Sequence, residues 1–156
     1  MRSRISVRSR AGLLLVAAML LELVVPLDSA SAGGQATLQA VMIHASNSPA
    51  PIDRRLENIE YKLRRVFGFE HYRHVGEGSV TISLPGEGTI DLGGGYRLML
   101  RSSNTKDGRI RTQVTWSKGG ATLLSTSTKV RRGAPPTVIG GASQGGGKLI
   151  VTLVVK

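Results

Sequence analysis

From residue 69 to the C-terminus, the chain consists of short runs separated by turn segments, and within several of these runs apolar and polar residues alternate. In "RIRTQVTW" (residues 109–116), Ile110, Val114 and Trp116 fall in one register, and arginine and glutamine fall in the other. Successive side chains of a β-strand point to opposite faces, so the pattern predicts a strand with one buried and one wet face. The run "LIVTLVV" (149–155) is apolar in both registers and predicts a central strand.

Short turn segments separate the predicted strands. A first strand is predicted at 36–46, "ATLQAVMIHAS", and later ones at "FEHYRHV", "SVTISL", "TIDL", "YRLMLRS", "RIRTQVTWS", "ATLLSTSTKV", "TVIG" and "KLIVTLVV". The intervening "GEG", "PGEG", "GGG", "KGG", "RRGAPP" and "GASQGGG" have the composition of turns. "KDG" at 106–108 is the clearest hairpin signal, because it joins two strands of similar length.

One segment has a helical period instead. Between residues 51 and 67, apolar residues recur at intervals of three and four and form one stripe: Leu56, Ile59, Leu63, Val66 and Phe67. Glu60 and Arg64 have the spacing of an i,i+4 ion pair. Gly68 follows and predicts the end of the helix. We expect Leu56, Ile59, Leu63 and Phe67 to pack against a sheet.

These elements predict an α+β fold that is predominantly β. With one helix available, a parallel crossover has little material, so short turn-linked strands favour antiparallel pairing. We therefore expect an antiparallel sheet or sandwich of about seven to nine short strands with one amphipathic helix packed on it.

The N-terminal region has the organisation of a signal peptide. Arginines precede an apolar run from residue 11, and "ASA" at 30–32 matches a cleavage site. The apolar run is interrupted by Glu22 and Pro26, which makes it short for a membrane span of about 20 residues. We expect a signal peptide at residues 1–32 and a single β-rich domain at 33–156, with its helix at 51–67.

The composition of the chain indicates its cellular compartment and the kind of partner that its charge attracts. The chain has no cysteine, whereas small extracellular animal domains commonly carry disulfides. We therefore expect an exported bacterial protein, periplasmic or at the cell surface. Residues 33–156 hold 17 basic and 8 acidic residues, a balance that attracts anionic partners.

Motifs for nucleotide binding fail on inspection. "GASQGGGK" ends like a phosphate-binding loop, but Ala142 stands at the position of its first glycine and Leu149 at that of its Ser or Thr. "GEGTIDLGGG" has Asp91 at the third glycine position of a dinucleotide fingerprint, and no helix follows. We predict neither cofactor, and expect a glycine hairpin loop before Leu149.

Candidate catalytic and metal-binding groups do not form a set. His71 and His74 are three residues apart, so on a strand they would diverge, and no metal site is predicted. Glu87 and Asp91 are candidates for an acid–base pair, but they flank a predicted turn with neighbouring glycines, and no substrate cleft is indicated. No catalytic residue is predicted.

Basic residues are the remaining candidates for binding. On the helix, Arg54, Arg55, Lys62 and Arg65 could form a contact surface or serve only to solvate the helix. Further arginines are spread over the predicted strands and turns: Arg97, Arg101, Arg109, Arg111, Arg131 and Arg132. With six aromatic residues and an exported location, nucleic acid is not an expected partner.

Three stretches carry a resemblance. "PIDRRLENIEYKLRRVFGF", "GYRLML" and the closing "VIGG…GGGKLIVTLV" resemble small exported bacterial β-rich proteins of uncharacterised function. "TSTKVRRGAPPTVIGG" (126–141) also resembles the C-terminal strand-turn-strand of secretins, which implies an envelope-associated role. Together these features predict a non-catalytic module that binds an envelope protein or an anionic envelope polymer. The alternative is a small carbohydrate-active or other hydrolytic enzyme using Glu87 or Asp91.

Overall fold

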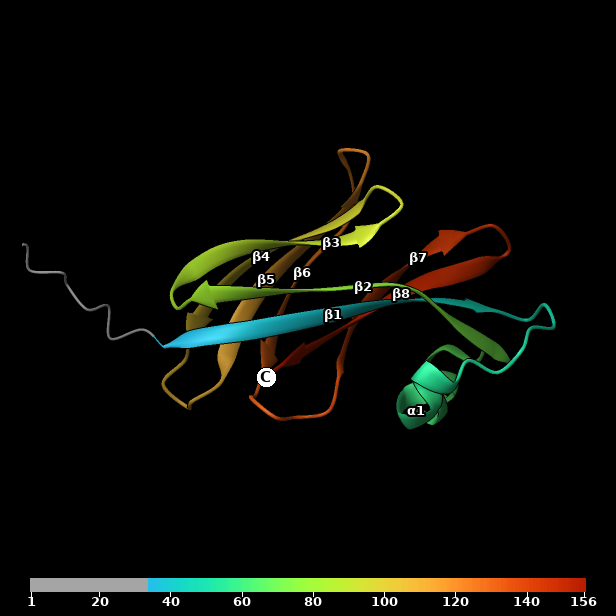
Figure 1. Ribbon diagram of the computed structural model, residues 1–156, viewed down its shortest axis with the longest axis horizontal. Helices are drawn as coiled ribbons and strands as arrows, with labels where there is room; N and C mark the ends of the chain where they lie inside the picture. Colours follow the sequence, from blue (N-terminus) through green and yellow to red (C-terminus); the bar gives the residue numbers. More distant parts are fainter. Residues whose placement is uncertain (1–33) are drawn as a thin grey trace, which may run out of the picture. The chain divides into compact units, whose positions relative to one another are not determined.

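The computed structural model describes residues 34–156, which form eight β-strands and one short helical segment (Figure 1). The strands are β1 (Gln35–Ser46), β2 (His71–Ser83), β3 (Gly86–Gly93), β4 (Tyr96–Asn104), β5 (Ile110–Lys118), β6 (Ala121–Val130), β7 (Thr137–Gln144) and β8 (Gly147–Val155). A 3₁₀ turn, η1 (Arg54–Leu56), leads into helix α1 (Glu57–Phe67). The predicted signal peptide lies outside the described residues.

The strands form two antiparallel sheets of four strands each. The first sheet has the order β2-β1-β8-β7, and the second has the order β3-β4-β5-β6. Apart from one isolated bridge, all pairings within residues 34–156 are antiparallel. The predicted predominantly β, α+β fold is confirmed.

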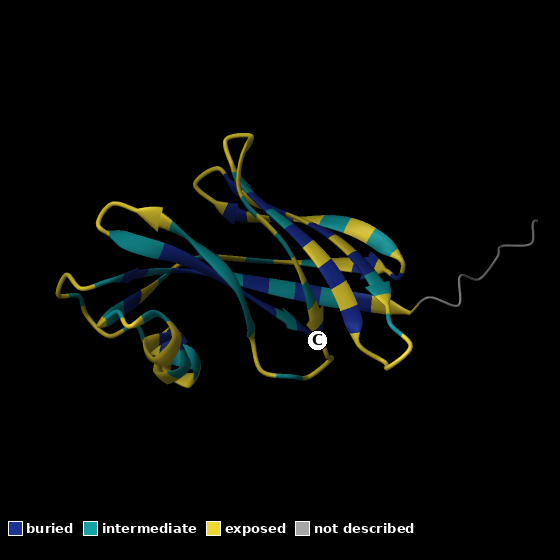
Figure 2. Cartoon of the chain, turned by 180° about the vertical axis from the view of Figure 1, so that it is seen from behind, coloured by how far each residue is buried: buried dark blue, intermediate teal, exposed yellow. Residues whose placement is uncertain are grey.

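The main core lies between the two sheets and follows the alternation of the sequence. On β5, Ile110, Val114 and Trp116 are buried, whereas Arg111 and Gln113 are exposed. The same division runs along β3 and β4, and dark blue and yellow alternate along such strands in Figure 2. β8 lies inside the first sheet, and in its stretch 149–155 every residue except Val154 is buried, as predicted for a central strand.

Helix α1 covers the outer face of the first sheet at one end. Leu56 and Leu63 are buried against Ile43, Tyr72 and Ile150, with Ile59 and Phe67 partly buried beside them. The four predicted contacts are therefore confirmed, but Val66 is 65% exposed and does not belong to the buried stripe.

The helical segment begins later than predicted and ends where predicted. Residues 51–53 are not helical, because the Asp53 carboxylate accepts a hydrogen bond from the Arg55 backbone N–H and caps the first turn at Arg54. Gly68 ends the helix in the left-handed conformation (φ 71°). The Arg64–Glu60 ion pair forms, at 2.8 Å.

The glycines of "GEG" at 76–78 do not form the predicted turn. They lie inside the continuous strand β2, where β3 crosses closely. A Cβ on Gly76 would lie 2.0 Å from the Leu92 carbonyl oxygen, and one on Gly78 would lie 2.6 Å from the Asp91 carbonyl oxygen. Glycine is needed here because the two backbones approach closely, not because the chain turns.

The loop of the last hairpin, between β7 and β8, is also shorter than predicted. β7 extends through "GGASQ" to Gln144, so only Gly145 and Gly146 form the turn, with φ values of 49° and 73°. The Tyr96 hydroxyl donates a hydrogen bond to Gln144 Oε1 at 2.8 Å and ties this strand to β4.

Candidate functional site

Most acidic side chains are already occupied by basic neighbours. Six of the eight acidic residues between 34 and 156 form ion pairs. These pairs are Asp53–Arg55, Glu60–Arg64, Glu77–His74, Asp91–Arg97, Glu87–Arg101 and Asp107–Arg109. Because basic residues outnumber acidic ones two to one, the cations outside these pairs are the ones free to meet an external anion.

The predicted helical cations divide into occupied and free groups. Arg55 is bound to Asp53, with its Nε 3.1 Å from Oδ1, and this hydrogen bond lowers the pKa of Asp53 to about 2. The Lys62 ammonium lies 5.9 Å from the centre of the Tyr61 ring. Arg54 and Arg65 are exposed and form no ion pair among the described residues. No single cluster of the four is evident from these contacts.

A denser group of cations lies on strands β5 and β6. Arg111 is directly opposite Lys129 on the outer face of the second sheet, and Arg109 and Arg131 continue the same two rows just beyond the strand ends. We call these four residues, Arg109, Arg111, Lys129 and Arg131, the β5–β6 basic surface. Like charges directly opposite each other destabilise a sheet, so the arrangement has a cost to the free protein.

The end of this surface is hollowed. Arg109, Lys129 and Arg131 line a cavity of about 320 Å³ that also includes Ala134 and Thr137. Within residues 34–156, the one acidic group ion-paired to the surface is Asp107, 3.6 Å from Arg109. A hydrogen bond from the Thr105 hydroxyl lowers the pKa of Asp107, and the Arg109 charge adds to this. Asp107 thus offsets one of four positive charges.

The neighbouring Arg132 has a different role. Its guanidinium donates hydrogen bonds to the backbone carbonyls of Lys156, at 3.4 Å, and of Gln35. It therefore fastens the C-terminal strand to the start of β1. Of the two consecutive arginines, Arg131 is the one that lines the cavity.

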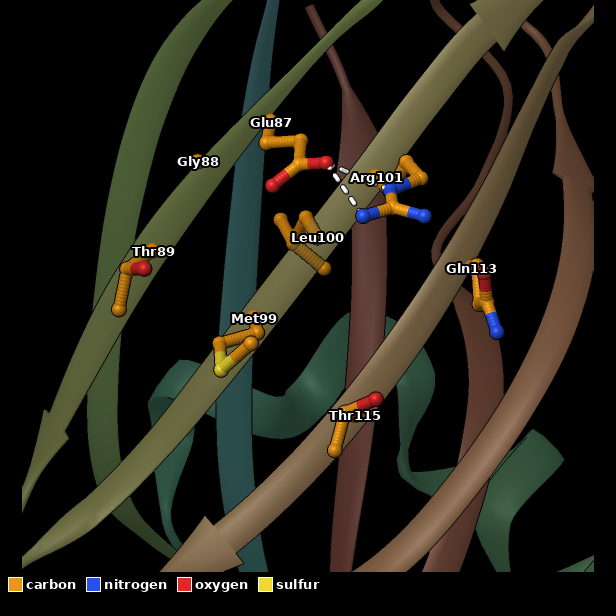
Figure 3. Close-up of a pocket in the computed structure, with 8 residues that line it drawn as sticks. All are labelled: Glu87, Gly88, Thr89, Met99, Leu100, Arg101, Gln113 and Thr115. Carbon is orange, nitrogen blue, oxygen red and sulfur yellow. Dashed lines mark hydrogen bonds and ion pairs between the residues drawn. The ribbon is translucent and has the colours of Figure 1, made fainter.

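The same outer face continues into a second depression. Thr89, Met99, Gln113 and Thr115 line a cavity of about 400 Å³ together with the ion pair Glu87–Arg101 (Figure 3). The Arg101 guanidinium lies 2.6 Å from the Glu87 carboxylate. Gln113 is two residues from Arg111 on the same face of β5, so this polar depression adjoins the β5–β6 basic surface.

The proposed acid–base residues are separated from the histidines. Glu87 and Asp91 both lie on the outer face of β3, each beside an arginine. His74 lies on β2 of the other sheet, where its ring is 3.2 Å from Glu77 and its backbone N–H donates to Asp53. His71 lies on the opposite face of β2, as its spacing predicted. The carboxylates and histidines do not converge in a shared cavity.

Two further observations concern residues 34–156. No helix there is long and apolar enough to cross a membrane. No group of three His, Cys, Asp or Glu side chains in this part of the chain is arranged to hold a metal ion.

No protein-family model, curated protein or solved structure is significantly similar to this chain. The resemblance to exported bacterial proteins and to the secretin strand-turn-strand therefore stays a prediction.

Proposed function

We propose that this protein is an exported, non-catalytic β-sandwich module that binds an anionic polymer of the cell envelope. The binding site is the β5–β6 basic surface, extended along the polar outer face of the second sheet. The observation that carries this proposal is the direct opposition of Arg111 and Lys129, continued by Arg109 and Arg131. An anion lying across these rows would remove the repulsion that the free protein bears.

A polymer fits this face better than a small anion does. The four cations are exposed and span two strands rather than enclosing a point. The adjoining depression presents hydroxyl and amide groups, Thr89, Thr115 and Gln113, that form hydrogen bonds with the uncharged parts of a polysaccharide. Exposed cations act mainly through screened attraction, so binding should weaken steeply with salt.

The test compares two double variants that remove the same charge. Arg111→Gln/Lys129→Gln removes two cations from the β5–β6 basic surface, and Arg54→Gln/Arg65→Gln removes two from the helical segment. Fluorescence anisotropy with labelled polygalacturonate, a carboxylated polysaccharide, measures affinity at low and moderate salt. The sheet variant should bind roughly thirtyfold more weakly, because about 1 kcal/mol is lost with each of its two cations. The helix variant should bind like the parent.

Other outcomes are equally informative. Equal weakening of both variants would show diffuse attraction to net charge and would overturn the site. Weakening of the helix variant alone would place the site on Arg54 and Arg65, as the sequence suggested. If the parent showed no salt-sensitive binding, the proposal that it binds an anionic polymer would be overturned.

Export has its own test. The proposal expects mass spectrometry of the protein from a bacterial host to find an N-terminus at Gly33 or within a residue or two of it. An intact Met1 in the membrane fraction would show an uncleaved anchor.

A further inference from the structure

A second group of basic side chains lies on the inner face of the first sheet, away from the β5–β6 basic surface. His44 on β1 is directly opposite Arg73 on β2, and Ser46 is directly opposite His71. Side chains two residues apart on a strand share a face, so these four residues lie together. The intervening Ile43, Ala45 and Tyr72 point the other way and are buried beneath helix α1.

This group lies where the second sheet no longer covers the first. In Figure 1 the ends of β1, β2, β7 and β8 near the helix extend beyond the turn between β3 and β4. Two adjoining cavities occur here, of about 220 and 200 Å³. Both are lined by His44 and Arg73, which therefore stand at their common boundary.

The two cavities have different linings. The lining of the larger one is mixed: besides His44 and Arg73 it includes the apolar side chains of Met42, Val75 and Leu149, with the Tyr96–Gln144 hydrogen bond at its wall. The smaller one includes His71 and Ser46, together with Pro49 and Ala50 of the following loop. Its loop wall is held in place by Asn47, whose Oδ1 accepts a hydrogen bond from the Glu70 backbone N–H at 3.1 Å.

The backbone leaves room for the imidazole of His44. A Cβ on Gly147 would lie 3.0 Å from His44 Nε2 and 2.3 Å from the Ala45 carbonyl oxygen. Arg73 forms no ion pair with any acidic side chain in residues 34–156. The nearby Lys148 faces the opposite side of the sheet, 5.6 Å from the centre of the Phe67 ring. Arg73 thus has no acidic partner in this part of the chain and lies beside a cavity that includes the apolar side chains of Met42, Val75 and Leu149.

We propose that this cleft binds a small organic carboxylate with a compact apolar body. The Arg73 guanidinium would hold the carboxylate through two parallel hydrogen bonds, which its planar fork favours. His44 and His71 would supply further donors, and the apolar body would occupy the cavity lined by Met42, Val75 and Leu149. Cavities of about 150 Å³ accommodate benzene, so the larger cavity admits a ligand of benzoate size.

The test uses benzoate and its uncharged counterpart benzamide. Amide chemical shifts of the ¹⁵N-labelled protein are followed as each compound is added up to about 20 mM, a range that detects millimolar dissociation constants. Benzoate should produce saturable shifts at His44, Arg73 and Leu149. Benzamide should bind at least about tenfold more weakly, because it cannot form the charge-assisted pair.

Two variants complete the test. Arg73→Gln should reduce benzoate affinity at least about tenfold, whereas Arg65→Gln, which removes the same charge from the helix, should leave it unchanged. The proposal is overturned if benzoate gives no saturable shifts, if benzamide binds equally well, or if Arg65→Gln weakens binding as much as Arg73→Gln. Arg73→Gln should leave polygalacturonate binding intact, so this result is separate from the fate of the proposed polymer site.

Discussion

Arg111 lies directly opposite Lys129 across strands β5 and β6, with both side chains on the exposed face of the second sheet. Neither forms an ion pair with an acidic residue in the described part of the chain. A sheet gains stability when such a pair carries opposite charges and loses it when the charges are alike. The Arg111–Lys129 pair therefore lowers the stability of the sheet, whereas the same two charges would raise the affinity for an anionic ligand.

This separation gives a first prediction. Lys129→Glu should raise the free energy of unfolding by roughly 0.2–1 kcal/mol, because a carboxylate then faces Arg111. The same change should weaken binding to polygalacturonate. Urea unfolding at low salt measures the first effect, and added salt should diminish it. A Lys129→Glu variant less stable than the parent would contradict the observed register, and Lys129→Gln should lie between the two.

Sequence patterns predict each of these strands, but not their pairing. β5 and β6 are joined at Gly119 and Gly120, and Lys118 pairs with Ala121 next to the turn. Continuing that register without interruption would place Thr128 opposite Arg111. A bulge at Leu123 shifts the register by one residue and brings Lys129 there instead. Alternation specifies which face a side chain takes, whereas the bulge depends on packing that one strand does not reveal.

The buried residues of the core and of the helix could be predicted from the sequence more fully than the strand pairing could. Burial requires apolar side chains at fixed intervals, so Leu56, Leu63 and Trp116 could be assigned to the interior from spacing alone. The cleft at His44 and Arg73 could not, because those residues are 29 positions apart in sequence and meet only through the β1–β2 register. Likewise, glycines that admit a crossing backbone have the same sequence signature as glycines in a turn.

Those glycines give a second prediction. Gly76→Ala should destabilise the protein by about 1–3 kcal/mol or more, because its Cβ would lie 2.0 Å from the Leu92 carbonyl oxygen and force β2 and β3 apart. Gly34→Ala is the matched control, since a Cβ there would meet only the Arg132 side chain at 3.8 Å. Urea denaturation compares the two. Equal stability of both variants would argue against the close crossing of β2 and β3.

A third prediction concerns the helix on the first sheet. Leu63 is 1% exposed, so Leu63→Ala should cost about 2–5 kcal/mol, the range for emptying a packed site. Val66 is 65% exposed, and Val66→Ala should change stability by less than about 0.5 kcal/mol. Chemical denaturation followed by Trp116 fluorescence measures both. A Leu63→Ala variant as stable as the parent would be inconsistent with the helix packed on this sheet.

The last prediction is a pH dependence centred on Asp53. Its carboxylate accepts hydrogen bonds from the Arg55 side chain at 3.1 Å, from the Arg55 backbone N–H at 3.1 Å and from the His74 backbone N–H at 3.0 Å. The Arg55 side chain is the largest cause of its pKa falling from 3.8 to about 2. The unfolded chain therefore binds a proton more readily than the folded one, and the charged carboxylate stabilises the fold.

This contribution is complete above the unfolded pKa and is lost as the pH falls from about 4 towards 2. Asp53→Ala, which also removes the cap of η1, should cost about 0.5–2 kcal/mol at pH 7. The difference from the parent should shrink at pH 2.5, as measured by urea unfolding at each pH. Glu70→Ala, an exposed acid with no ion pair in residues 34–156, should change stability by less than about 0.5 kcal/mol at pH 7. A cost of Asp53→Ala that stayed constant down to pH 2.5 would show that its carboxylate charge has no part in holding the helical segment to β2.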